Sequence, residues 1–169
     1  MNTRLNLKPG VLSVIIAIVA ASALGMPASG SATAPQPASG TFKADIDFDT
    51  LSLAPVGSNC VLQVDGELTF SGTLEGTAPG TTTALVFASC DEVATHPPGT
   101  FRDVFISALE FEGAVDGVPV TADVTYQGQV REGGSVDALI RVSNGANGVL
   151  EVEGSVAEGG SYSGSLRSK

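Results

Sequence analysis

The stretch from Phe101 to Val130 constrains the fold most strongly, because apolar and polar residues alternate in it on both sides of an Asp-Gly pair. A period of two is typical of a β-strand with one buried face. Asp116-Gly117 is a strong hairpin signal, since both central residues of a type I′ turn need positive φ. We therefore expect an antiparallel hairpin that turns at this dipeptide.

Folding the chain about this turn brings two apolar faces into register. The pairs that this register predicts are Val115 with Val118, Phe111 with Ala122, Leu109 with Val124, and Phe105 with Gly128. Large side chains then meet small ones, as a close-packed interior requires. The same register places Arg102 opposite Arg131 on the outer face, an unfavourable pairing that predicts splaying at that end.

The alternation recurs along the rest of the chain, with turns rich in Gly, Pro and Asn between the alternating segments. Further strands are predicted over residues 41–50, 60–77, 82–90, 136–143, 149–156 and 161–166. With the hairpin this gives eight strands in meander order, which predicts an all-β fold, an antiparallel up-and-down β-barrel without open edges. A two-sheet β-sandwich is the alternative, because strand number alone does not separate the two.

The N-terminus has the features of a secretory signal peptide, which we place with its processing region at residues 1–34. Arg4 and Lys8 precede an apolar run over residues 11–23, and small residues suited to cleavage follow it. The run is short for a permanent membrane span, which needs about 20 residues. We therefore expect a secreted, extracellular protein; the alternative is membrane anchoring through an uncleaved N-terminal segment.

Two composition changes divide the remainder of the chain. Residues 35–40 are rich in Pro, Ala, Ser and Gly and are predicted to form a flexible spacer. Residues 41–169 continue the strand pattern to the end and are predicted to form a single β-barrel domain.

The chain contains two cysteines, Cys60 and Cys90. In an exported protein an even number of cysteines favours a disulfide. Closing a loop of about 30 residues would stabilise the fold by roughly 3–4 kcal/mol on the chain-entropy model. The alternatives, a reactive thiol or a metal-binding pair, need partner residues that the sequence lacks.

The acidic charge limits the partners of this protein. The formal net charge is −10, and loss of the leader with Arg4 and Lys8 would leave 6 basic against 18 acidic residues. Such a chain repels nucleic acid and anionic membrane surfaces, so we expect neither as a partner once the signal is cleaved. No cofactor is predicted, and the oligomeric state is left open.

Four segments carry a resemblance to a known family. They are ELTFSGTLEG (Glu67–Gly76), FEGAVDG (Phe111–Gly117), VLEVEGSV (Val149–Val156) and GGSYSGSL (Gly159–Leu166). This pattern resembles bacterial uncharacterised proteins related to the allene oxide cyclase-like β-barrel family, a small calycin-like barrel. The resemblance implies an inner cavity able to hold an apolar small molecule, and some relatives are cyclases that fold a lipid- or polyketide-like substrate inside the barrel. No catalytic residue of those enzymes matches a motif here, so none is assigned.

The polar residues that suggest catalysis or metal binding have simpler explanations. His96 is the only histidine and lies in a Pro-rich segment, where a solvated loop residue is expected. Asp45, Asp47 and Asp49 alternate to one face of a strand and are expected to face water, since no calcium-binding loop pattern accompanies them. No metal site is predicted.

Some polar residues alternate with apolar ones toward the expected interior. Asp103 and Ser107 share a face with Phe105, and Tyr126 lies opposite Ser107 in the predicted register. A few polar groups in an apolar wall are how a small-molecule pocket fixes ligand orientation. The candidate ligand-binding residues are Phe70, Asp103, Phe105, Ser107, Tyr126 and Tyr162. The alternative places Asp103 at a solvated rim and the tyrosines in the core with their hydroxyls at the rim.

Three functions remain compatible with the sequence. The first is a secreted barrel that binds a small apolar ligand, which needs only an apolar cavity of about 300 Å³ or more, or that serves a structural role without a ligand. A cyclase or isomerase needs convergent titratable groups, and the residue pattern favours a protein without enzymatic activity over this alternative. A protein–protein interaction module would have a filled barrel and an outer apolar patch, for which Val104, Ile106 and Leu139 are the candidates.

Overall fold

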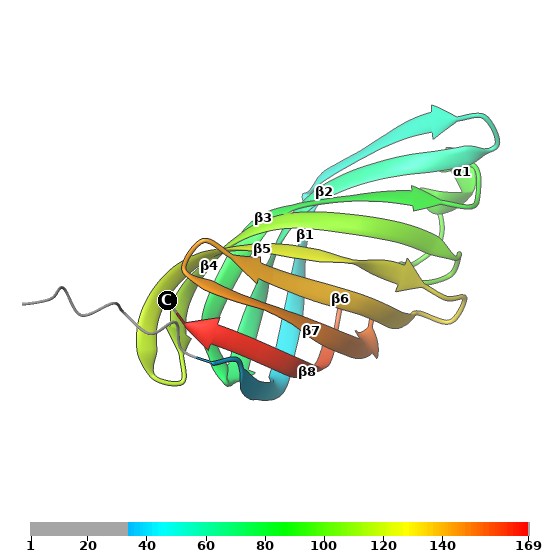
Figure 1. Ribbon diagram of the computed structural model, residues 1–169. Coiled ribbons are helices and arrows are strands. Elements are labelled where there is room, and N and C mark those ends of the chain that lie inside the picture. Colours follow the sequence, from blue (N-terminus) through cyan, green and yellow to red (C-terminus); the bar gives the residue numbers. More distant parts are fainter. Residues whose placement is uncertain (1–33, 169) are drawn as a thin grey trace, which may run out of the picture. The chain divides into compact units, whose positions relative to one another are not determined.

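The computed structural model describes residues 34–168, which form eight strands and one short helix. The elements are β1 (Gln36–Val56), β2 (Asn59–Gly72), β3 (Leu74–Val86), α1 (Cys90–Val93), β4 (Asp103–Val115), β5 (Val118–Val130), β6 (Ser135–Ser143), β7 (Ala146–Ser155) and β8 (Gly159–Ser168). Each strand pairs with the next along the chain, and β8 pairs with β1, so the sheet closes (Figure 1). The predicted eight-stranded up-and-down barrel is confirmed. The sandwich alternative is wrong because every strand belongs to one continuous ladder.

The β4–β5 hairpin has the predicted register. Phe105 lies opposite Gly128 and Phe111 opposite Ala122, and the ladder ends at Val115 opposite Val118. Asp116 and Gly117 have φ angles of 51° and 77°, the left-handed conformation that a type I′ turn requires.

The arginine pair expected at the far end of this hairpin is relieved by two separate contacts. The Arg102 guanidinium lies over the Phe87 ring, 5.3 Å from its centroid. Arg131 pairs with Asp137, with 2.6 Å between the nitrogen and the carboxylate oxygen. Arg102 and Arg131 both lie beyond the paired residues of β4 and β5, so the two like charges separate without breaking the ladder.

The start of β1 corrects the predicted domain boundary. A flexible spacer is predicted over residues 35–40, but β1 begins at Gln36. Residues 36–40 pair with residues 162–166 of β8, and Ala38 is buried. Residues 36–40 therefore form part of β1 although their composition alone favours a spacer. Their pairing satisfies the backbone hydrogen-bonding groups of β8 and closes the barrel. Residues 1–33 of the predicted signal peptide lie outside the described residues.

The boundary between β2 and β3 also differs from the prediction. Strands over 60–77 and 82–90 are predicted, whereas the chain reverses at Thr73 and β3 runs through Pro79. Gly72 adopts a φ of 114°, and the Tyr162 hydroxyl accepts a hydrogen bond from Leu74 N–H at 2.8 Å, which fixes the turn. The β3–β4 ladder is interrupted beside Pro79, so the missing proline N–H leaves no gap in a continuous ladder.

A single turn of helix, α1, lies between the predicted strand over 82–90 and the Pro-rich segment around His96. Ser89 caps it: its hydroxyl accepts from Glu92 N–H, while the Glu92 carboxylate accepts from Ser89 N–H at 3.0 Å. This is a capping box, whose Ser-x-x-Glu spacing is visible in the sequence. Hydrogen bonds from Ser89 lower the pKa of Glu92. Among residues 34–168, no helix is both long enough and apolar enough to cross a lipid bilayer.

One half of the barrel interior, around the β4–β5 turn, is filled by side chains. We call it the packed half, and its core comprises Ala38, Phe42, Leu68, Phe70, Leu74, Ala78, Leu109, Phe111, Val115, Ala122, Val124, Ile140, Val142, Ala146, Leu150, Val152, Tyr162 and Leu166. Edge-to-face contacts link Phe70 to Phe111 and to Tyr162, with ring centroids 5.9 Å apart in both pairs. Gly40 lies against the Tyr162 ring, where a Cβ would collide with the phenol oxygen.

Candidate functional site

The other half of the interior, toward α1 and the β5–β6 turn, contains a cavity of about 360 Å³. We call it the hollow half. Apolar side chains from several strands form most of its wall, including Val64, Ala84, Leu109 and Val130. The barrel is therefore filled at one end and open inside at the other, a difference that alternation along the strands does not reveal.

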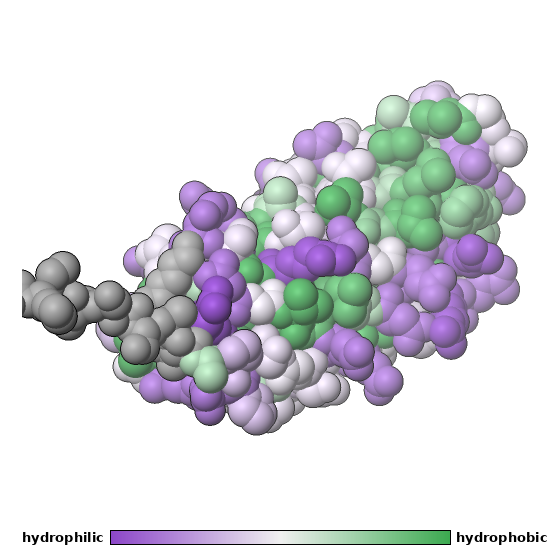
Figure 2. All heavy atoms as spheres, viewed as in Figure 1, coloured by the Kyte–Doolittle hydropathy of each residue, from purple (hydrophilic) through white to green (hydrophobic). Residues whose placement is uncertain are grey.

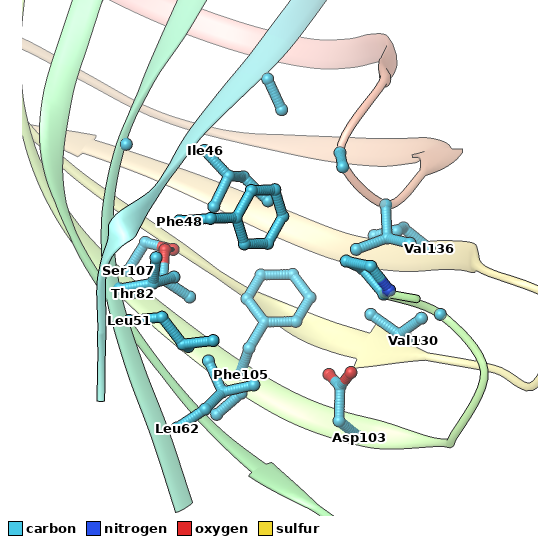
Figure 3. Close-up of a pocket in the computed structure, with 18 of the residues that line it drawn as sticks. Ile46, Phe48, Leu51, Leu62, Thr82, Asp103, Phe105, Ser107, Val130 and Val136 are labelled. Atoms are coloured by element: carbon cyan, nitrogen blue, oxygen red, sulfur yellow. Dashed lines mark hydrogen bonds between the residues drawn. The ribbon is translucent and has the colours of Figure 1, made fainter. Parts of the chain in front are cut away.

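A bulge in β1 shapes one side of the cavity. Four residues, Phe48 to Leu51, stand opposite one residue of β2, because Asp47 pairs with Asp65 and Ser52 with Gln63. The insertion changes which positions face inward, so Phe48 and Leu51 both line the cavity (Figure 3). Bulges re-aim side chains beside binding sites.

Thr50 holds the bulge together. Its hydroxyl accepts a hydrogen bond from Asp65 N–H at 2.8 Å and donates to the Asp47 carbonyl at 2.7 Å. These two bonds replace the ladder bonds that the insertion removes.

The cavity opens where β1 leaves β8. The β1–β8 pairing ends at Lys43 opposite Gly159, while β1 continues to Val56 paired only with β2. Phe48 and Leu51 therefore stay 51% and 38% exposed at this opening, which we call the mouth. Figure 2 shows hydrophobic surface gathered at the end of the barrel where β1, β2 and α1 lie.

The predicted Cys60–Cys90 disulfide is confirmed, with a Cα–Cα distance of 4.9 Å. It joins β2 to the start of α1, and the segment that follows, residues 93–101, borders the mouth. The disulfide thus fixes one border of the cavity to the barrel wall.

His96 lies in this bordering segment and is exposed, as expected for a loop residue. Its Nδ1 is 2.8 Å from the Glu92 carbonyl oxygen, and its ring meets Phe101 edge-on at 5.3 Å. It also lines the mouth of the cavity, a position that the sequence does not reveal.

Asp103 is a carboxylate inside the hollow half. It is only 9% exposed and points toward the cavity beside Phe105 (Figure 3). None of the described residues donates a hydrogen bond to its side chain. Burial raises the pKa of Asp103 from 3.8 to about 7, because a carboxylate loses hydration there without gaining a partner.

Three further polar side chains lie in the cavity wall. Ser107 and Thr82 share a hydrogen bond of 2.7 Å between their hydroxyls. Tyr126 lies edge-on to Phe105 and to Phe42, at 4.8 and 5.9 Å between ring centroids. Burial raises the pKa of the Tyr126 phenol above its ordinary value, so its hydroxyl remains a hydrogen-bond donor.

The candidate site residues divide between the two halves. Asp103, Phe105, Ser107 and Tyr126 all line the cavity, whereas Phe70 and Tyr162 lie in the packed half. The sequence missed Thr82, the bulge residues and the segment over 93–101. Of these features, only the helix that precedes the segment over 93–101 has a signal in the sequence, the Ser89-x-x-Glu92 capping box.

Metal ligands do not come together in the part of the chain that the structure describes. No group of three His, Cys, Asp or Glu side chains in it is arranged to hold a metal ion. Asp45, Asp47 and Asp49 are exposed on β1, the placement expected of a solvated face.

No protein-family model matches this chain, and no curated protein matches its sequence. Its fold is similar to that of a solved structure, a protein of unknown function of the DUF3224 family from Shewanella oneidensis MR-1. The TM-score is 0.57 over 80% of this chain and 98% of that chain, with 15% sequence identity. This similarity shows an eight-stranded barrel fold and no function; the narrower relation to the allene oxide cyclase family stays a prediction.

Proposed function

We propose that this protein is a secreted binding barrel that holds one small, mainly apolar molecule in its hollow half. The observation that supports this most directly is the cavity of about 360 Å³ with an apolar wall and a few inward polar groups. Ligand sites in proteins are usually pockets of roughly 300–1,000 Å³ with this composition. The cavity is at the small end of that range, so it suits a molecule of one or two fused rings.

Secretion is part of the proposal. The apolar run behind Arg4 and Lys8 supports a signal peptide, and the Cys60–Cys90 disulfide suits an oxidising compartment.

The area available gives an expected affinity. A two-ring ligand that buries about 300 Å² gains about 7 kcal/mol at about 25 cal/mol/Å². Immobilising the ligand offsets part of this gain. We therefore expect a dissociation constant between about ten micromolar and about one millimolar for an unspecialised two-ring probe.

Titration with 1-naphthalenemethanol, a neutral two-ring alcohol, tests the proposal. The chain has no Trp, so the fluorescence of the naphthalene reports binding without interference. Saturable binding is expected for the natural chain and its loss for Ala84→Phe, because Ala84 is buried in the cavity wall and a phenyl ring there fills the space. Ala108→Phe, an exposed outward position of β4, is the matched control and should still bind. Absence of saturable binding, or equal binding by both variants, would overturn the proposal.

The cyclase or isomerase alternative is favoured by one observation, the position of Asp103. A carboxyl group with a pKa of about 7 in an apolar cavity is suited to general acid–base work. Its test is the exchange of the α-protons of 2-tetralone in deuterated buffer, followed by NMR. Exchange faster than in buffer, lost in Asp103→Asn, would support an enzyme; no acceleration would leave a binding barrel.

The interaction-module alternative has weaker support. Val104 and Ile106 are 39% and 50% exposed on the outer face, but Leu139 is half-buried and the barrel is not filled.

A further inference from the structure

We infer that the ligand is an apolar molecule carrying one cationic amine, which the Asp103 carboxylate receives while the apolar body packs on Phe105. This inference rests on the proposed binding function and names the chemical class of its ligand.

The Asp103 carboxylate is isolated from polar side chains of the neighbouring strands. Its paired neighbours across β3 and β5 are Val86 and Val130, both buried and both without a polar side chain. The side chain receives no hydrogen bond from the described residues and points into the cavity (Figure 3). The carboxylate oxygens face the cavity and not a protein donor, so their hydrogen-bond partner is supplied from the cavity, by water or by a ligand that displaces it.

The side chains around the cavity provide no basic partner for Asp103 among the described residues. None of the described residues that line the cavity is Lys or Arg. The nearest arginines along the chain are engaged elsewhere, Arg102 over Phe87 and Arg131 with Asp137. Among residues 34–168, no Lys or Arg side chain is therefore placed to neutralise Asp103.

The other titratable side chains that line the cavity include one histidine and one tyrosine. His96 borders the mouth and bonds the Glu92 carbonyl, and Tyr126 remains a neutral phenol. Three acids also border the cavity but occupy exposed, outward positions of β1 and β2: Asp45, Asp65 and Glu67. Acidic side chains thus outnumber basic ones among the described residues around the cavity, which favours a cation over an anion.

An aromatic wall lies beside the carboxylate. Phe105 lies two residues from Asp103 on the same face of β4, and its ring contacts Tyr126 at 4.8 Å. Aromatic faces attract ammonium groups and also provide flat apolar area. A molecule with an aromatic or alicyclic body and a short aminomethyl arm would place its body on Phe105 and its nitrogen at Asp103.

Three probes with the same body and different charge test this inference at pH 8. They are 1-naphthylmethylamine, a cation; 1-naphthalenemethanol, neutral; and 1-naphthoate, an anion. The amine should bind about tenfold or more tightly than the alcohol, because a charge-assisted hydrogen bond forms only with the amine. The anion should bind more weakly than the alcohol.

The variant Asp103→Asn should remove the preference for the amine while keeping the affinity for the alcohol. Glu110→Gln, an exposed outward position of β4, is the matched control and should keep the preference. Lowering the pH to 5.5 should shrink the preference in the natural chain, and equally in His96→Gln, which separates Asp103 from the histidine.

The outcomes distinguish failure of the proposed binding function from failure of the inference that the ligand is an amine. If the alcohol does not bind, the proposed function fails. If the alcohol binds but the amine has no advantage, or the advantage survives Asp103→Asn, the binding function stands and this inference is overturned; a neutral ligand bonded to protonated Asp103 would then be indicated.

Discussion

At the residue scale, the interior of the barrel contains polar side chains with opposite roles. The Tyr162 hydroxyl in the packed half completes a turn, whereas the Asp103 carboxylate in the hollow half accepts no hydrogen bond from residues 34–168. Alternation along β4 and β8 predicts that both face inward. It does not show which of them is satisfied by the rest of the chain, because the partners come from other strands.

We expect Asp103→Asn to stabilise the fold at pH 8 and not at pH 4. The pKa of Asp103 is raised from 3.8 to about 7 by burial, so the folded state prefers the protonated form. That contribution to stability is fully present below about pH 4 and is lost as the pH rises through about 7. Asparagine does not ionise, so the variant does not lose stability as the pH rises. After allowance for water at the mouth, the gain at pH 8 should be about 1–2 kcal/mol, measured by thermal unfolding at both pH values. An equal effect at both pH values would contradict this explanation.

The two tyrosines should respond differently to loss of the hydroxyl. Tyr162→Phe leaves Leu74 N–H buried without a partner and should lower the free energy of unfolding by about 1–2 kcal/mol. Tyr126 forms no hydrogen bond with the described residues through its hydroxyl, so Tyr126→Phe should change stability by less than about 0.5 kcal/mol. Denaturant unfolding of both variants measures the difference, and similar losses would show that Tyr162 does not fix the β2–β3 turn.

At the element scale, the hollow half depends on how single elements are modified. The bulge over 48–51 turns β1 inward at two positions, and the disulfide attaches α1 to β2. Both changes occur where β1 has no partner on its β8 side, so they define the mouth while the β1–β8 pairing that closes the barrel stays intact. The sequence predicted the disulfide from its even cysteine count but gave no sign of the bulge.

Replacement of both cysteines by alanine should weaken both the fold and the site. Loss of the disulfide should lower the free energy of unfolding by about 3 kcal/mol, since the unfolded chain regains a loop of about 30 residues. The segment over 93–101 also loses its attachment to β2, so affinity for 1-naphthalenemethanol should fall. Reduction of the natural chain under non-denaturing conditions should give the same changes in affinity. Unchanged binding after either treatment would show that α1 does not hold the mouth in place.

At the scale of the whole molecule, the barrel divides its interior into a packed half that provides stability and a hollow half with space for a ligand. The strands are continuous through both halves, so the same ladders support them. Shortening a side chain in a closely packed core lowers the free energy of unfolding more than shortening one that already faces a cavity.

Leucine substitutions should measure this division. Leu150→Ala in the packed half removes a fully buried side chain and should cost about 2–5 kcal/mol. Leu62→Ala, at the cavity wall, enlarges an existing space and should cost about 1 kcal/mol. Denaturant unfolding of the two variants provides the comparison. Equal costs would mean that the cavity collapses in solution.

The sequence by itself determined the strand order, the β4–β5 register and the inward face of Asp103, Phe105, Ser107 and Tyr126. These follow from a period of two and from turn chemistry, which are local properties of the chain. Tertiary structure decided the boundary of β1, the bulge, the division into two halves and the isolation of Asp103. Each of these depends on which strands close the barrel and how their side chains fill it, and such long-range packing leaves no periodic signal along the chain.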